Sequence, residues 1–284
     1  MSWIIKQSHN FLFVPASRPE RFAKAFNAGA DCVILDLQDA VPAEQKQNAR
    51  ELLARALEGF TAEQLSRTLV RINAVHSSWH DDDVNLLATW TAKGLAGVMV
   101  PKAEVPAELH LVGMALGESA ALVPLIESLA GMDAASPLAQ VPQVSRLAFG
   151  HLDFQLDLGM RCSPDESELT SVRFDLVAAS RRANLVAPID GVTVDTSNSD
   201  RLKSDSERGK ALGFGGKLCI HPSQLAVVSE VYAPSQSEIE WARRVVAEAR
   251  SRNGETFSLD GRMVDLPVVL LAERSLASAG VATM

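Results

Sequence analysis

The chain has 284 residues, of which 47% are hydrophobic and 22% charged, and these are ordinary values for a folded globular protein. A single (β/α)8 barrel of about 250 residues fits this length without a second domain. The net charge of −8 argues against a nucleic-acid-binding protein, because phosphate backbones attract a basic surface.

Eight short and nearly continuous apolar segments follow one another along the chain. Segments of this kind are typical of strands that are buried on both faces, as in a parallel sheet. They are FLFVPA (11–16), CVILDLQD (32–39), TLVRIN (68–73), GVMVPKA (97–103), ALVPLIES (121–128), RLAFGHLD (146–153), DGVTVD (190–195) and KLCIHP (217–222).

Amphipathic segments lie between them and predict helices. They cover about 19–28, 43–57, 79–92, 106–117, 130–140, 167–184 and 200–212. Several end in glycine directly before the next apolar segment, which is the expected helix stop. The repeated alternation predicts an α/β fold with a parallel sheet. Eight units favour closure into a (β/α)8 TIM barrel over an open, doubly wound sheet.

The chain continues beyond the eighth apolar segment. Residues 236–252 predict one more helix, and a Gly-rich polar loop then leads to another helix from about Leu266. We interpret residues 1–252 as the catalytic barrel domain. Residues 253–284 are then a C-terminal helical extension, which serves as a lid or as an oligomer contact.

Polar side chains end nearly every apolar segment. In a barrel of this type, the active site lies at the C-terminal ends of the strands. The residues at these ends are Ser17, Arg18, Asp36, Asp39, Arg71, Asn73, Lys102, Glu104, Glu127, Asp153, Asp195 and His221. A rim that served stability alone would not need so many converging charges, so the pattern predicts a functional site.

Glu127 and Asp153 follow successive strands, whose axes should lie about 4.8 Å apart. Two carboxylates at that separation repel each other unless a positive charge lies between them. A Mg²⁺ ion would supply that charge, with water and substrate oxygens as its remaining ligands. The alternative is that each carboxylate pairs with a lysine or arginine, for example Lys102.

Zinc is the rival metal, because His76 and His80 are four residues apart and close to Asp81–Asp83. This segment is, however, typical of a helix start, where acidic residues are explained by the helix dipole alone. We therefore favour a solvated helix over a zinc site.

Three groups of basic side chains remain. Arg71 either grips a substrate carboxylate or is a partner of Asp36 or Glu127. Lys102 at the end of the fourth strand could form a Schiff base, although the carboxylate pair favours a structural or electrostatic role.

Arg18, Arg21 and Lys24 lie near the start of the first predicted helix, where an anion is stabilised. Phosphate binding and a solvated helix face are both open interpretations. His221 is either functional or a packed residue of the rim.

The remaining features concern the compartment. No apolar segment approaches the 20 residues of a membrane span, and the N-terminus lacks the pattern of a secretory signal. Cys32, Cys162 and Cys219 are odd in number and far apart, and no CxxC pair is present. We expect reduced thiols and a cytoplasmic location.

At these residues the sequence resembles the citrate lyase β-subunit-like proteins of the HpcH/HpaI aldolase superfamily. The opening LFVPASRPERFAKAFNAGADCVILDLQDAV is similar to theirs. The later blocks VRIN, VMVPKAE, LIES with Gly131, FGHLDFQLDLG, GKLCIHPSQ and SLDGRMVDLP follow in the same order. The likeness covers roughly residues 10–275.

The resemblance implies a TIM barrel that assembles as trimers or hexamers. Mg²⁺ would be bound by Glu127 and Asp153, and Arg71 would contact a 2-oxo acid. Asp265 matches an aspartate of the C-terminal lid, which serves as acid or base in a neighbouring subunit's site. Residues near Arg18 and Lys24 would meet the phosphates of coenzyme A.

The implied reaction is the Mg²⁺-dependent cleavage of a β-hydroxyacyl-CoA, such as citramalyl-CoA or malyl-CoA, to acetyl-CoA and a 2-oxo acid. The alternatives are a citrate lyase β-subunit acting on a citryl thioester, a free-acid pyruvate aldolase, and a binding or regulatory module on a retained barrel. The chain departs from the family at Gln38, where glutamate is frequent, and at His151–Leu152, where Ala-Glu is usual. Both departures lie close to the chemistry and could mark a different substrate.

Overall fold

The computed structural model describes residues 3–252 and 255–280. Residues 1–2 of the predicted barrel domain and residues 253–254 and 281–284 of the predicted extension lie outside this range. The chain divides into two compact units, Met1–Ser229 and Glu230–Met284. No helix in the described ranges has both the length and the apolar character needed to cross a membrane.

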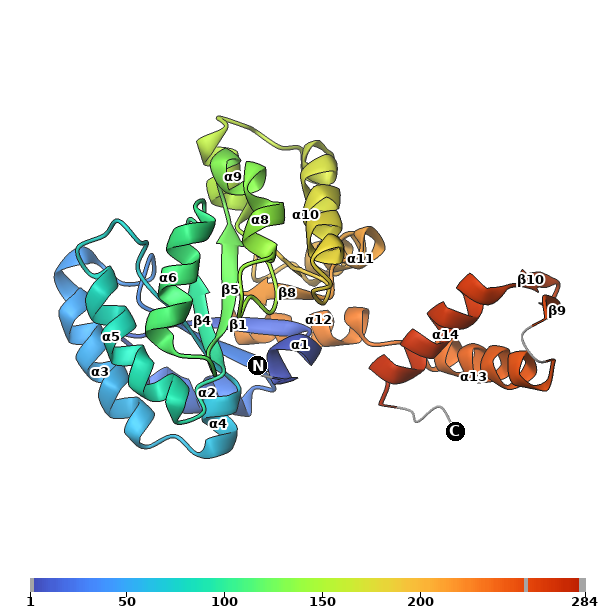
Figure 1. Ribbon diagram of the computed structural model, residues 1–284, viewed down its shortest axis with the longest axis horizontal. Coiled ribbons are helices and arrows are strands. Elements are labelled where there is room, and N and C mark those ends of the chain that lie inside the picture. Colours follow the sequence, from blue (N-terminus) through green and yellow to red (C-terminus); the bar gives the residue numbers. More distant parts are fainter. Residues whose placement is uncertain (1–2, 253–254, 281–284) are drawn as a thin grey trace. The chain divides into compact units, whose positions relative to one another are not determined.

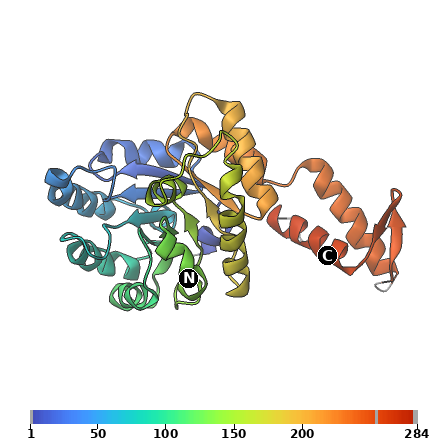
Figure 2. The ribbon, with the colours of Figure 1, turned by 90° about the horizontal axis from the view of Figure 1, so that it is seen from above.

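The first unit contains a closed barrel of eight parallel strands in sequential order, in which β8 pairs with β1. Figures 1 and 2 show helices around these strands. The prediction of a (β/α)8 barrel is therefore confirmed. The strands are β1 (Asn10–Pro15), β2 (Cys32–Asp36), β3 (Thr68–Arg71), β4 (Gly97–Val100), β5 (Ala121–Ile126), β6 (Ala148–Phe149), β7 (Ile189–Asp190) and β8 (Gly216–Cys219).

Helices form in all the segments for which the sequence predicts them. The main ones are α2 (Phe22–Asn27), α3 (Lys46–Glu58), α5 (His80–Ala92), α6 (Pro106–Leu116), α7 (Leu129–Asp133), α8 (Ala135–Ala139), α10 (Thr170–Arg182) and α11 (Ser199–Leu212). Further short helices, which the sequence pattern does not predict, are α1 (Trp3–Gln7), α4 (Ala62–Ser66), α9 (His151–Asp157) and α12 (Leu225–Tyr232).

The sixth and seventh strands are shorter than the apolar segments that predict them. The segment 146–153 leaves the barrel at Gly150 and turns into α9, so that Asp153 lies in the first turn of a helix and not at a strand end. The apolar pattern continues past the strand because Phe154 of α9 packs edge-on against Phe149, with ring centroids 5.7 Å apart. Asp195 lies in an exposed loop beyond β7.

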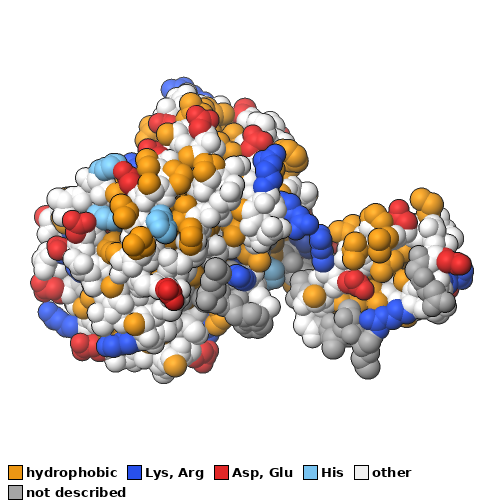
Figure 3. Space-filling view, in the orientation of Figure 1, with side chains coloured by type: hydrophobic (Ala, Val, Ile, Leu, Met, Phe, Trp, Pro, Cys, Tyr) orange, Lys and Arg blue, Asp and Glu red, His pale blue; other side chains and the backbone are white. Residues whose placement is uncertain are grey.

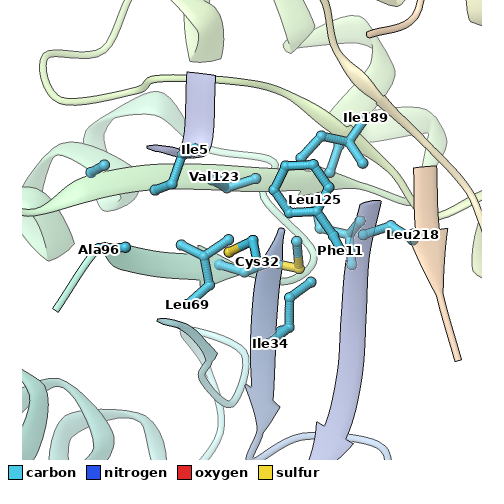
Figure 4. Close-up of a cluster of buried hydrophobic side chains, with 13 residues drawn as sticks. Ile5, Phe11, Cys32, Ile34, Leu69, Ala96, Val123, Leu125, Ile189 and Leu218 are labelled. Atoms are coloured by element: carbon cyan, nitrogen blue, oxygen red, sulfur yellow. The ribbon is translucent and has the colours of Figure 1, made fainter. Parts of the chain in front are cut away.

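Apolar side chains fill the barrel interior, as Figure 4 shows for Phe11, Ile34, Leu69 and Leu125. The barrel is therefore a packed core and not a pore. At its N-terminal end, the buried Arg146 donates hydrogen bonds to the carbonyls of Ile5 and Ser8, which ties α1 to this core.

The second unit consists of α13 (Gln236–Ser251), a hairpin of β9 (Phe257–Leu259) and β10 (Arg262–Val264), and α14 (Leu266–Ser278). Val245, Phe257 and Val264 belong to its buried apolar cluster. The hairpin turn places both central residues at positive φ, 52° for Asp260 and 75° for Gly261. Asp-Gly is a preferred pair for such a turn, so the dipeptide Asp260–Gly261 indicates this hairpin in the sequence.

Candidate active site

A cavity of about 370 Å³ lies at the C-terminal ends of the barrel strands. Five of its lining residues are charged groups that the sequence places on the rim: Asp36, Asp39, Arg71, Glu127 and Asp153. Its other walls are mainly apolar and include Phe13, Leu125, Phe149, Val192 and Leu218. The predicted convergence of polar side chains on one rim is thus observed for strands two, three, five and six.

Arg71 and Asp36 are neighbours in the register of β3 and β2. Arg71 Nε donates to Asp36 Oδ1 at 2.7 Å, and Nη2 donates to Oδ2 at 2.6 Å. The Asp36 carboxylate also accepts the backbone N–H groups of Gln38 and Ala40. The third nitrogen, Nη1, lies 3.3 Å from the exposed Asp39. Arg71 is therefore both a partner of Asp36 and a cation at the cavity wall, so the two alternatives for it are not exclusive.

Glu127 is buried directly after β5, and its Oε1 accepts the backbone N–H of Lys102 at 2.8 Å. Lys102 has a φ of 47°, in the left-handed region that a residue with a side chain rarely adopts. Gly150 packs against the other side of Glu127, where a Cβ atom would lie 2.6 Å from the Glu127 Cβ. The carboxylate is thereby held between two stretches of backbone.

Asp153 shares two neighbouring cavities with Glu127. Burial, and then the repulsion from Asp153, raise the pKa of Glu127 to about 7. No lysine, arginine or histidine nitrogen lies within ion-pair distance of either carboxylate in the described part of the chain, which disfavours the ion-pair alternative.

Two carboxylates in these surroundings are a donor set that fits Mg²⁺, which binds through one or two carboxylates and keeps open positions for water and substrate. Both carboxylates line the same two cavities, and among the described residues neither has a cationic partner, so a divalent cation would offset their mutual repulsion.

The side chains considered for a zinc site and for a Schiff base do not come together in the structure. His80 is buried and its Nδ1 lies 3.0 Å from the Asn73 carbonyl, whereas His76 is exposed beside Glu108. Among the described residues, no three His, Cys, Asp or Glu side chains come together as a metal site. Lys102 is exposed, and its side chain is not part of the main cavity wall.

The predicted anion site near the first helix is only partly assembled. Arg21 and Lys24 line a separate cavity of about 370 Å³ together with His221. Arg18 is half-exposed and forms an ion pair with Glu20, with Nε and Oε1 2.6 Å apart. The Nδ1 atom of His221 accepts the backbone N–H of Ser223, so this histidine orders the turn after β8.

Asp265 belongs to the second unit and is the N-cap of α14. Its side chain accepts the backbone N–H of Val268 at 3.4 Å. A capping aspartate is one of the favoured residues at this position, so the local structure accounts for an acidic residue here. Its predicted role as an acid or base stays a prediction.

His151 is a cavity residue that the sequence singled out only as a departure from the family. It is 3% exposed, and its Nε2 lies 3.3 Å from Oε1 of Glu166. Glu166 is also paired with Arg173, at 2.5 Å, and with Arg208, at 3.0 Å. Glu166 lies far from the strand ends in sequence, and no local pattern marks it. Gln38 is buried but does not line this cavity.

Comparisons with known proteins were consistent with this geometry. The family model described as HpcH/HpaI aldolase/citrate lyase matches residues 9–222. A citrate lyase subunit beta-like protein of Deinococcus radiodurans is 35% identical over 94% of the chain and 95% of its own length. A (3S)-malyl-CoA thioesterase of Cereibacter sphaeroides is 33% identical, and the match covers 96% of each chain.

A solved structure gives the same fold. It is the protein CitE from Mycobacterium tuberculosis in complex with magnesium, acetoacetate and coenzyme A. Its TM-score to this chain is 0.83 at 35% sequence identity, and the match covers 97% of this chain and 99% of CitE.

Proposed function

The chain belongs to the HpcH/HpaI aldolase/citrate lyase family, and from this membership we propose that it is a Mg²⁺-dependent carbon–carbon lyase acting on a coenzyme A thioester. Its substrate is a β-hydroxyacyl-CoA of the citramalyl-CoA or malyl-CoA type, and its products are acetyl-CoA and a 2-oxo acid. The single observation that carries the proposal is that Glu127, Asp153 and Arg71 line one cavity.

Glu127 and Asp153 are the residues that would hold the metal. A Mg²⁺ ion held there would polarise the oxygens of the substrate and would lower the pKa of its hydroxyl group. Arg71 binds the carboxylate of the departing 2-oxo acid through Nη1, because Nε and Nη2 are already committed to Asp36. The apolar walls at Phe13 and Phe149 keep water from the reacting carbon atoms.

Cleavage breaks the bond between the hydroxyl-bearing carbon and the acetyl carbon. The hydroxyl proton passes to solvent and the oxygen becomes the keto oxygen, while the electron pair of the broken bond stays with the acetyl carbon, which must then gain a proton. We assign this proton to Asp265, acting in the site of a neighbouring copy of the chain. Residues 253–284 then serve as a lid that brings Asp265 to the substrate and excludes water.

Arg18 and Lys24 are assigned to the phosphates of coenzyme A. The support for this is the cavity that Lys24 lines with Arg21 and His221, beside β1 and β8. Two cationic side chains next to one cavity suit a polyanionic group. To do so, Arg18 would have to exchange its partner Glu20 for a phosphate oxygen. This costs little free energy, because an exposed ion pair contributes little to stability.

We further propose that the chain assembles as a trimer or hexamer in the cytoplasm. Large apolar side chains are exposed on the first unit, including Leu111 at 62%, Met114 at 64% and Leu156 at 80%. Figure 3 also has many hydrophobic side chains on the face that it draws. Exposed apolar patches favour contacts between chains. All three cysteines are free, as in a reducing compartment.

The experiment that tests the function is incubation with a panel of thioesters, including citramalyl-CoA and malyl-CoA, with Mg²⁺ and with EDTA. Free 2-oxo acid and free thiol are measured separately. We expect Mg²⁺-dependent release of pyruvate or glyoxylate without free coenzyme A. Release of coenzyme A with the hydroxy acid intact would indicate a thioesterase. Cleavage of free acids would indicate an aldolase, and activity only on a carrier-protein thioester would indicate a citrate lyase subunit.

A further inference from the structure

A second cavity of about 320 Å³ lies next to the proposed active site. Three residues line both cavities and form the partition between them: His151, Leu152 and Val192. The second cavity is polar, and its other lining residues include Thr193, Asp195, Asn198, Arg201 and Asp205. The size of the space available to a substrate therefore depends on this partition.

The imidazole of His151 is the rigid part of the partition, because Leu152 is 45% exposed and His151 only 3%. The ring is in contact on three sides. Nε2 faces Glu166, the ring of Phe149 lies 6.1 Å away between centroids, and Gly191 lies against Nδ1. A Cβ atom at Gly191 would be 2.1 Å from that nitrogen, so the ring fits only because residue 191 is glycine.

Glu166 in turn is held in place by its backbone conformation and by two arginines. Its backbone is in the left-handed region, with a φ of 49°, and Arg173 and Arg208 pair with its Oε2. Charge-assisted hydrogen bonds of this kind are the strong ones in a protein interior. The imidazole therefore does not swing freely into either cavity.

We propose that His151 is the specificity-determining residue that limits the length of the carbon chain on the 2-oxo acid. This inference rests on the proposed function and extends it to the substrate class: short 2-oxo acids with at most a small alkyl group. The carboxylate end is bound at Arg71, and a short alkyl group packs against the apolar wall of Phe149 and Val192. A longer chain meets the imidazole. Without the imidazole, the two cavities join and a longer chain fits.

The test measures binding and not turnover. Dissociation constants for glyoxylate, pyruvate, 2-oxobutyrate and 2-oxovalerate are measured by calorimetry in saturating Mg²⁺. One methylene group in an apolar pocket is discriminated by about 10- to 200-fold. We therefore expect the parent protein to bind pyruvate at least about 10-fold more tightly than 2-oxovalerate, and His151→Ala to lose most of this ratio.

Three further variants separate chain length from other effects. His151→Gln keeps a long hydrogen-bonding side chain next to Glu166 and should keep the parent ratio. His151→Asn keeps the same chemistry but is one methylene shorter, so its ratio should move towards that of His151→Ala. It also provides the test if His151→Ala does not fold. His110→Ala removes an exposed histidine on α6 and should change nothing.

The outcomes distinguish the inference from the function on which it rests. Equal ratios in the parent, His151→Asn and His151→Ala would overturn the inference even if the parent cleaves a thioester. A parent that binds the oxo acids with the expected ratio but cleaves no thioester contradicts the proposed reaction alone. A parent that binds no 2-oxo acid in Mg²⁺ contradicts both.

Discussion

Arg71 and Asp36 are joined by two parallel hydrogen bonds, of 2.7 and 2.6 Å, between directly paired residues of β3 and β2. A guanidinium that is held at two nitrogens has its plane fixed, so the third nitrogen points in one direction only. Both side chains are largely buried, so the attraction between them is less sensitive to salt than that of a surface pair. The hydrogen bonds to Asp36 therefore also orient the guanidinium of Arg71 for binding a carboxylate.

Arg71→Lys removes this fixed direction while keeping the positive charge. We expect kcat/KM to fall by about 100-fold or more, which is the usual cost when a group that positions the substrate is misplaced. Steady-state kinetics on the best thioester of the panel measure this. Arg55→Lys, an exposed arginine on α3, is the matched control. A lysine variant as active as the parent would show that the orientation of the guanidinium is unimportant.

Asp153→Asn removes one of the two charges assigned to the metal while preserving the shape of the side chain. We expect Mg²⁺-dependent turnover to be abolished and the fold to stay intact, because Asp153 forms no ion pair in the described structure. A ligand that binds only the folded state raises its stability, so Mg²⁺ should raise the melting temperature of the parent. The variant should lose that shift. Full activity of Asp153→Asn would remove the role assigned to Asp153.

Gly150→Ala tests whether the backbone holds Glu127 in position. The added Cβ would lie 2.6 Å from the Glu127 Cβ and 2.7 Å from its Oε2, so the carboxylate must move. We expect Mg²⁺ binding to weaken by at least about 10-fold, since metal affinity depends on carboxylate position. Gly59→Ala, where the nearest atom is 3.6 Å away, is the control. Isothermal titration with Mg²⁺ measures both, and unchanged affinity in Gly150→Ala would contradict this account.

The barrel itself could be predicted from the sequence because each strand is buried on both faces. Such a strand is a continuous apolar segment, which can be recognised in a single sequence. The positions of Glu127 and Arg71 in the cavity wall could be predicted for the same reason, since each ends such a segment. Asp153 lines the same cavity as Glu127, but it lies in the first turn of α9 and not at a strand end as the sequence pattern predicts.

The wall of the site could not be predicted. His151 and Glu166 come together through a loop between α9 and α10, and their contact is set by Arg173 and Arg208, which lie on two different helices. Such long-range pairs leave no periodic signal in a single sequence. The four short helices were missed because helices of five to eight residues contain too few turns to show an amphipathic pattern.

The charge of Glu166 makes stability depend on pH. Burial acts to raise the pKa of this carboxyl, but the hydrogen bonds and charges of His151 and Arg173 outweigh it and hold the pKa far below its ordinary value of 4.5. A group whose pKa is lower in the folded state contributes stability above its unfolded pKa. That contribution is lost as the pH falls towards the folded pKa.

Glu166→Gln should therefore destabilise the protein by about 3 kcal/mol at pH 7, as expected for removing one partner of a buried charge network. The difference should shrink by about 1.4 kcal/mol for each pH unit below 4.5. Urea unfolding of both proteins between pH 7 and pH 3.5 measures it. Glu44→Gln, an exposed glutamate, is the control. A difference that is constant over this range would contradict the assigned pKa direction.

Substitutions of Asp265 can distinguish its role as a helix cap from its proposed role as a proton donor. As the N-cap of α14, it needs only an oxygen that accepts the N–H of Val268, and asparagine supplies that oxygen equally well. As a proton donor, it needs an ionisable carboxyl group, which asparagine lacks. We expect Asp265→Asn to keep the melting temperature of the parent while kcat falls by about 100- to 10,000-fold, the usual contribution of general acid–base catalysis. Asp265→Ala should lose about 1 kcal/mol of stability as well, because the cap is gone. If Asp265→Asn turns over like the parent while only Asp265→Ala is impaired, then Asp265 serves α14 alone and the proton must come from another group.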